Sequence, residues 1–119
     1  MRFDDEDPYD GLLAASEATL DDAGFGVIAM DGDHRVVFYN RFESSLSGLR
    51  PERVVGRHFF TEVAPCTNNF MVAHRFETED VLDATIDYVF TLRMTPTPVR
   101  LRLLSRPGAE RRFLLVQRS

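Results

Sequence analysis

An alternation of apolar and polar residues near the end of the chain constrains the fold most. In the segment 99–103, a valine and two leucines alternate with two arginines. A period of two places the apolar side chains on one face of a β-strand and the arginines on the other. The segment 88–94 has the same period, with the apolar residues at 88, 90, 92 and 94, and another apolar segment, 113–116, follows the turn-forming pair Pro107-Gly108. The sequence therefore predicts three consecutive strands in this region.

Two further strands are predicted earlier in the chain. The apolar segments 27–30 and 36–39 flank Asp31-Gly32-Asp33-His34, and the Asp-Gly pair tolerates the positive φ angles of a tight hairpin turn. Between 40 and 81, glycines and prolines divide the chain into short helices, with Pro51 suited to a first helical position. We expect a longer helix to begin after Asn69 and to run through Phe76.

The start of the chain predicts one short helix and carries an excess of negative charge. Asp10 can cap a helix that runs through Leu20, and Gly24 can end it in a left-handed conformation. Acidic residues crowd this start, whereas arginines crowd the segment 100–118. The two ends should attract each other, but two separate solvated faces of opposite sign are the interpretation that such charge runs favour.

This order of elements defines the expected fold. Two strands, short helices and three strands predict an α+β domain with a five-stranded antiparallel sheet and helices on one face. The other sheet face is partly apolar and needs a cover, for which the segment 1–24 is available. A chain of 119 residues has room for one domain. We therefore expect a single domain with an N-terminal cap at 1–24 and a core at 25–119.

Composition excludes several classes of function. The net charge of −5 argues against nucleic-acid binding through bulk charge. The apolar runs are too short for a membrane span and the start is acidic, so we expect no membrane contact and a cytoplasmic location. Three histidines without a shared spacing predict no metal site.

The chain has a single cysteine, Cys66, within Val63-Ala64-Pro65-Cys66-Thr67. One thiol cannot form a disulfide framework. It could be an inert buried thiol, a nucleophile activated by His58 or His74, or a point of covalent attachment. Sequence spacing alone leaves these three interpretations open.

A second group of polar residues precedes the cysteine. Asn40 and Glu43 have the spacing of a helix capping box. The aromatic residues around Glu43 also predict burial, which would raise the pKa of its carboxyl and keep it protonated. With Tyr39 and Ser47, this carboxyl forms a local cluster of hydrogen-bond donors that suits an anionic oxygen.

Four ordered stretches resemble the photoactive yellow protein family, whose members are blue-light photoreceptors with a PAS fold. The stretches lie at similar spacing over most of the chain, and they are Gly24-Phe25-Gly26-Val27-Ile28 with Met30-Asp31-Gly32-Asp33, Tyr39-Asn40 with Glu43, Val54-Val55-Gly56 with Phe59-Phe60 leading to Cys66-Thr67, and Met94-Thr95-Pro96-Thr97.

The resemblance implies a cofactor and a site. It implies that p-coumaric acid (4-hydroxycinnamic acid) is attached to Cys66 as a thioester and that Tyr39 and Glu43 hydrogen-bond its phenolate. Ser47 would support the tyrosine hydroxyl. The implied pocket is lined by Ile28, Leu49, Phe59, Ala64, Pro65, Thr67, Phe90 and Met94. The chain departs from the family at Leu49, where an arginine is expected, and at Leu92, where an aromatic residue is expected.

The resemblance also implies how the protein would signal. Light would drive trans-to-cis isomerisation, Glu43 would transfer its proton to the phenolate, and partial unfolding would follow. We expect the N-terminal cap to loosen first, because its sequence shows few large apolar residues to hold it. The expected partner is an unidentified downstream signalling protein, and the expected state is a monomer or weak dimer without enzymatic activity. The alternatives are a chromophore-free PAS module for ligand binding or protein interaction, and a cysteine-dependent acyltransferase or hydrolase.

Overall fold

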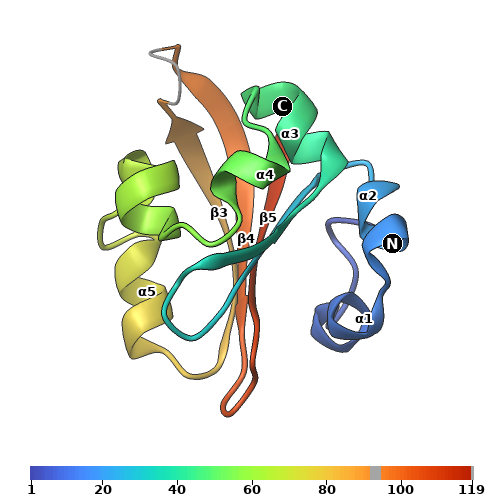
Figure 1. Cartoon of the computed structure of the whole chain (residues 1–119). Coiled ribbons are helices and arrows are strands. Elements are labelled where there is room, and N and C mark those ends of the chain that lie inside the picture. Colours follow the sequence, from blue (N-terminus) through green and yellow to red (C-terminus); the bar gives the residue numbers. More distant parts are fainter. Residues whose placement is uncertain (92–94, 119) are drawn as a thin grey trace.

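The computed structural model describes residues 1–91 and 95–118, which form one antiparallel sheet flanked by short helices (Figure 1). The five strands lie in the order β2-β1-β5-β4-β3. Their bounds are β1 Gly26–Met30, β2 Val36–Tyr39, β3 Leu82–Phe90, β4 Thr97–Ser105 and β5 Arg112–Arg118. The fold class expected from the sequence is confirmed.

The apolar alternation in β4 is what makes the sheet two-sided. Val99, Leu101 and Leu103 belong to one apolar cluster, whereas Arg102 lies on the opposite face. β3 begins at Leu82, six residues before the alternating segment that predicted it, and the expected positions of Leu92 and Met94 lie outside the described residues.

The turns lie where the sequence predicts them, but in one of them the positive φ falls on a different residue. Gly108 has a φ of 69° in the turn between β4 and β5, as a glycine permits. Between β1 and β2, the positive φ was expected at the Asp-Gly pair, but it falls on His34, with a φ of 62°. The side chain of Asp31 accepts hydrogen bonds from the backbone N–H groups of Asp33 and Arg35, which shapes this turn locally.

The helices and helical turns between β2 and β3 cover one face of the sheet (Figure 1). They are α3 Arg41–Ser47, α4 Pro51–Val54, the π-helical turn η1 Phe59–Val63, the 3-10 turn η2 Pro65–Thr67 and α5 Ala73–Thr78. Pro51 occupies the first turn of α4 as expected. The expectation of a long helix after Asn69 is wrong. The side-chain oxygen of Asn69 accepts hydrogen bonds from the backbone of Met71 and Val72, and the helix begins only at Ala73.

The N-terminal cap, residues 1–24, covers the opposite face of the sheet (Figure 1). It contains two helices, α1 Tyr9–Ala14 and α2 Glu17–Asp21, where one was expected. The interruption has a local cause, because the side chain of Ser16 accepts a hydrogen bond from the Thr19 N–H and starts a new helix. Gly24 does not adopt the expected left-handed conformation.

Large apolar side chains anchor the N-terminal cap, so the expectation that it has few of them is wrong. Its buried members pack with residues from β1, β2, β4 and β5, and they are Phe3, Tyr9, Leu12 and Leu20. Burying side chains of this size contributes about 1.5 to 3 kcal/mol each. The hydroxyl of Tyr9 also donates a hydrogen bond to the backbone carbonyl of Arg111.

The charges at the two ends of the chain meet, so the interpretation as two separate solvated faces is wrong. Arg106 pairs with Asp7 and Asp10 at the surface, where such pairs contribute little. Arg102 is different because it is only 8% exposed. Its guanidinium donates to the backbone carbonyls of Phe3 at 2.9 Å and Asp5 at 2.6 Å, and it also pairs with Asp83 on β3 at 2.8 Å. The arginine face of β4 is therefore the face that the N-terminal cap covers.

Within residues 1–91 and 95–118, no helix has the length and apolar character needed to cross a membrane.

Replacing Arg102 with Gln should loosen the N-terminal cap. The substitution removes charge-assisted hydrogen bonds, each contributing about 1.5 to 3 kcal/mol, to the two backbone carbonyls of the cap. We expect amide hydrogen exchange in residues 1–24 to accelerate by about tenfold or more. The matched control is Arg53→Gln, which makes the same charge change at an exposed position of α4. Equal exchange in the two variants would contradict this role of Arg102.

Candidate functional site

Glu43 lies in the first turn of α3, and its carboxyl points into the protein. Asn40 caps the helix, because its side-chain oxygen accepts a hydrogen bond from the Glu43 N–H at 3.1 Å. The return contact of a capping box is missing, since the backbone N–H of Asn40 donates to the carbonyl of Val27. The side chain of Glu43 is 0% exposed. The helix cap at Asn40 and the buried carboxyl at Glu43 are therefore confirmed, whereas the reciprocal contact of a capping box is not formed.

The carboxyl of Glu43 has a hydrogen-bond partner on only one of its oxygens. Arg118 donates from Nη2 to Oε2 at 2.7 Å, whereas Oε1 is buried without a partner. Burial raises the pKa of Glu43 to about 7, and the charge and hydrogen bond of Arg118 limit that rise. The carboxyl is therefore poised between its protonated and ionised forms near neutral pH.

The sequence interpretation did not include Arg118, which is the last residue of β5, the central strand of the sheet. On β5, Leu114 and Val116 belong to the apolar cluster on the helical face of the sheet, whereas Leu115 belongs to the cluster under the N-terminal cap. The period of two puts Arg118 on the same face as Leu114 and Val116. This alternation along β5 could have placed Arg118 on the helical face from the sequence. Nothing in the sequence shows which side chain an arginine on this face contacts.

Gly26 on β1 lets the carboxyl of Glu43 approach the sheet. A Cβ at position 26 would overlap Glu43 Oε1 and would lie 3.1 Å from the Cβ of Val116. Any residue other than glycine would therefore have to displace the carboxyl. The sequence identified this glycine only as part of a resembling stretch.

Tyr39 and Ser47 form the contact that the resemblance implied. Tyr39 is buried at the end of β2, and its hydroxyl hydrogen-bonds Ser47 Oγ at 2.8 Å. The backbone N–H of Leu49 also donates to this oxygen, at 3.2 Å. Burial raises the pKa of Tyr39, and the nearby carboxyl of Glu43 raises it further, so the phenol stays protonated.

Cys66 is half-buried on η2, and its backbone is held firmly. Its carbonyl oxygen accepts hydrogen bonds from the hydroxyl of Tyr88 and, at 3.2 Å, from the amide of Asn69. The side chain of Thr67 is fully buried and donates to the carbonyl of Ala64 at 2.7 Å. These contacts fix the loop that presents the thiol.

The structure brings most of the expected site residues together on the helical face of the sheet. One apolar cluster contains Tyr39, Ile28, Phe59, Ala64 and Phe90, with Leu49 and Cys66 packed against it. Pro65 is exposed, which does not suit the pocket wall expected of it. Met94 lies outside the described residues.

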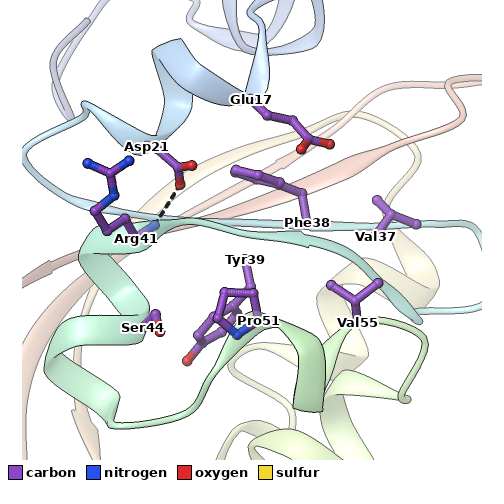
Figure 2. Close-up of a pocket in the computed structure, with 9 residues that line it drawn as sticks. All are labelled: Glu17, Asp21, Val37, Phe38, Tyr39, Arg41, Ser44, Pro51 and Val55. Carbon is purple, nitrogen blue, oxygen red and sulfur yellow. Dashed lines mark hydrogen bonds between the residues drawn. The ribbon is translucent and has the colours of Figure 1, made fainter.

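A surface groove of about 490 Å³ lies next to this region, between α2, β2 and the start of α3 and α4 (Figure 2). Figure 2 shows the Asp21 carboxylate accepting a hydrogen bond from the Arg41 N–H at the rim. Tyr39 contributes to its wall, but Cys66 and Glu43 do not. The groove is therefore separate from the site that the sequence predicted.

The donor set suits an anionic aromatic group better than a metal. Among residues 1–91 and 95–118, no group of three His, Cys, Asp or Glu side chains could hold a metal ion. A buried carboxyl with one unpartnered oxygen and a buried phenol can donate hydrogen bonds to an anionic oxygen, and the half-buried thiol packs against the same apolar cluster as the phenol.

Comparisons with known proteins agree with this description. The family model for the PAS fold matches residues 15–118. The photoactive yellow protein of Rhodothalassium salexigens is 31% identical, covering 99% of this chain and 97% of that relative. That of Halochromatium salexigens is 33% identical over 87% of this chain and 85% of its own. The photoactive yellow protein domain of the sensor histidine kinase Ppr from Rhodospirillum centenum superposes with a TM-score of 0.81 at 41% identity, covering 93% of this chain and 97% of that one.

Fold and sequence together define a PAS domain, a class of sensory modules. Within that class, the chain belongs to the photoactive yellow protein family. It is therefore a sensory module of the photoreceptor type and not an enzyme, and the family suggests a chromophore.

The Gly26→Ala variant should be less stable than the native chain, because the new methyl group collides with the Glu43 carboxyl in a packed core. We expect the free energy of unfolding to fall by about 1 to 3 kcal/mol. The matched control is Gly24→Ala, since no atom lies within 4 Å of a Cβ at that position. Denaturant unfolding of both variants checks this, and equal stability would show that Glu43 does not need the space at Gly26.

The stability of the ligand-free protein should fall as the pH rises through the titration of Glu43. The folded-state pKa, about 7, is above the ordinary value of 4.5, so the folded state binds this proton more tightly than the unfolded state. The contribution is fully present below pH 4.5 and is lost by about pH 7, a difference of about 3 kcal/mol. Glu43→Gln should remove this part of the pH dependence. The measurement is the free energy of unfolding of wild type and Glu43→Gln between pH 4 and 8. If it changed with pH in the same way in both proteins, the raised pKa could not be assigned to Glu43.

Proposed function

We propose that this chain is a blue-light photoreceptor that carries p-coumaric acid as a thioester on Cys66. The observation that carries the proposal is the fully buried Glu43 carboxyl beside the Tyr39 phenol, on the face of the sheet where the free thiol lies. Burying a carboxyl costs free energy, and buried carboxyls with a strongly shifted pKa gather at functional sites. The photoreceptor-type relatives make light sensing the function that this arrangement supports best.

Cys66 would hold the chromophore through its sulfur. The thiol attacks an activated p-coumaroyl carbonyl, the new S–C bond forms, and the activating group departs with the thiol proton. The carbonyl of Cys66 is held by Tyr88 and Asn69, so the backbone stays in place during this acyl transfer. The half-buried side chain leaves the sulfur open to the donor.

Tyr39 and Glu43 would hold the phenolic oxygen. A phenolate is costly to bury unless charge-assisted hydrogen bonds stabilise it. The raised pKa of Tyr39 keeps its proton in place for donation, and the raised pKa of Glu43 makes the protonated carboxyl available near neutral pH, where a phenolate beside it would favour that form further. Because a hydroxyl rotates freely, Ser47 can donate to the Tyr39 oxygen while Tyr39 donates elsewhere.

The bound chromophore would supply visible absorption and trans-to-cis isomerisation. Glu43 would then give up its proton to the phenolate and become a buried carboxylate. A buried charge without any partner costs about 3 to 5 kcal/mol, a large share of the stability of a small domain, and the single hydrogen bond from Arg118 offsets only part of this cost. Partial unfolding would relieve this cost and form the signalling state.

Asn40 links the carboxyl to the N-terminal cap, which is why we propose that the cap loosens first. Its side chain accepts from the Glu43 N–H and donates to the carbonyls of Leu20 at 2.9 Å and Phe25 at 3.0 Å. In the described part of the chain, the hydrogen bonds that join main chain to main chain in residues 1–24 stay within the cap, and side chains make its hydrogen bonds to the core. The strands are joined by full ladders, so the cap should open before any strand does, once its buried side chains and the Arg102 hydrogen bonds are released.

The partner would be a downstream signalling protein that binds the opened form. One relative is a domain of a sensor histidine kinase, and PAS domains pass signals to partner domains. A short-lived exposure of the cap surface suits a transient contact of this kind. We propose that the chain acts in the cytoplasm as a monomer or weak dimer.

Mixing the purified apoprotein with p-coumaric anhydride tests the proposal. We expect a stable yellow adduct, a mass increase equal to one p-coumaroyl group, and light-induced bleaching that recovers in the dark. Cys66→Ser should remain colourless and unmodified. Glu43→Gln should form the adduct with a shifted absorption band and a blunted structural response, because it keeps the hydrogen bond but lacks the transferable proton.

The outcomes separate the alternatives. A wild-type protein that forms no adduct would be a chromophore-free PAS module for ligand binding or interaction. Release of free p-coumaric acid with turnover would indicate a hydrolase. An adduct whose photocycle is unchanged in Glu43→Gln would remove Glu43 from the role of proton donor.

A further inference from the structure

We propose that Arg118 is the counter-ion of Glu43 and pairs with the negative charge that remains on the carboxylate when Glu43 loses its proton. The pairing itself is a property of the ligand-free chain, and its part in light sensing rests on the proposed function. In this arrangement Arg118 is a positioning residue for proton release.

The geometry joins two elements that lie far apart in sequence. Glu43 on α3 and Arg118 at the end of β5 are 75 positions apart in the sequence, and Figure 1 shows the end of β5 beside α3. The Nη2–Oε2 distance of 2.7 Å is that of a charge-assisted hydrogen bond. The side chain of Arg118 is 16% exposed and that of Glu43 is 0% exposed, so little water screens the pair.

Arg118 is held in place by the sheet and by an aromatic ring. Its backbone is in register with Val99 on β4, and its guanidinium carbon lies 5.8 Å from the centre of the Phe90 ring on β3. A guanidinium at this distance from an aromatic ring is attracted to it. Its Nε is buried without a partner, which leaves one more donor for a carboxylate that moves.

The other polar side chains described around Glu43 are neutral. Asn40 contributes an amide from the start of α3, Tyr39 a protonated phenol from β2, and Ser47 a hydroxyl from the end of α3. Gly26 and Val116 contribute no charge from β1 and β5. Among the described residues, Arg118 is therefore the cation that pairs with Glu43.

This pairing changes what proton release does to the protein. Without a cation, a new carboxylate in this core would have to leave it or recover its proton at once. With Arg118 in contact, the carboxylate can persist inside the fold long enough for other elements to respond. Arg118 thus favours the ionised form of Glu43, which is the form that the proposed signalling state requires.

The test uses the ligand-free protein, so it does not depend on a chromophore. Infrared spectroscopy follows the protonated carboxyl band of Glu43, identified by its loss in Glu43→Gln, as the pH changes. In Arg118→Gln, we expect the pKa of Glu43 to rise by about 1 to 3 units, as the loss of a contacting opposite charge predicts. The matched control is Arg41→Gln, which makes the same charge change at an exposed position of α3. Arg118→Lys should stay close to the wild type.

An identical titration in Arg118→Gln, Arg41→Gln and wild type would overturn the proposal. A second measurement covers the case in which Arg118→Gln does not fold. In wild-type protein, the side-chain nitrogen resonances of Arg118 should titrate with the same midpoint as Glu43, and Glu43→Gln should abolish that titration. Arg118 signals that ignore Glu43 would overturn the proposal in the same way.

The chromophore-loaded protein gives the functional readout. Light-induced loss of the Glu43 carboxyl band should be at least several-fold smaller in Arg118→Gln than in wild type, and equal losses would contradict the inference. Failure to form a yellow adduct would refute the proposed function, whereas the ligand-free titration would still decide whether Arg118 is the counter-ion.

Discussion

A sheet with two apolar faces is stable in water only if both faces are covered, and this constraint organises the whole chain. The helices between β2 and β3 cover one face, and the N-terminal cap covers the other. The candidate site lies under the first cover, whereas the element that we propose responds to light is the second. Asn40 joins them at the edge of the sheet, since it touches α3, β1 and the cap with one amide.

The buried carboxyl of Glu43 depends on its surroundings in a similar way. The missing side chain at Gly26 gives it space, Asn40 fixes the helix turn that carries it, and Arg118 balances part of its charge. A carboxyl buried with less stabilisation from a nearby cation would stay protonated at all ordinary pH values, and one with more such stabilisation would stay ionised. The pKa near 7 is the result of these opposing effects, and it is the range in which a proton can be exchanged readily.

Much of the fold could be predicted because period-two alternation and turn residues are local signals. The strands β4 and β5 and the start of α4 followed from them. Local signals also explain the failures, since Ser16 and Asn69 each redirect the backbone through one side chain. Arg118 could not be found, because its contact with Glu43 depends on the packing of α3 against β1, which brings the carboxyl to the end of the neighbouring strand β5, and not on spacing. The sequence shows the acidic and basic segments, but not that they are in contact. That contact depends on which face of β4 carries Arg102, because this is the face that the cap covers.

The hydrogen bonds to the carbonyl of Cys66 have a mechanical consequence. Tyr88 belongs to the edge strand β3, and its hydroxyl together with the Asn69 amide ends on this one oxygen. The sulfur can therefore change position by rotation about the side-chain bonds of Cys66 while the main chain stays in place. A displacement of the Cys66 main chain must either break the hydrogen bond from Tyr88 or move β3 as well. The edge of the sheet would therefore respond to large movements at the cysteine and not to small rotations of its side chain.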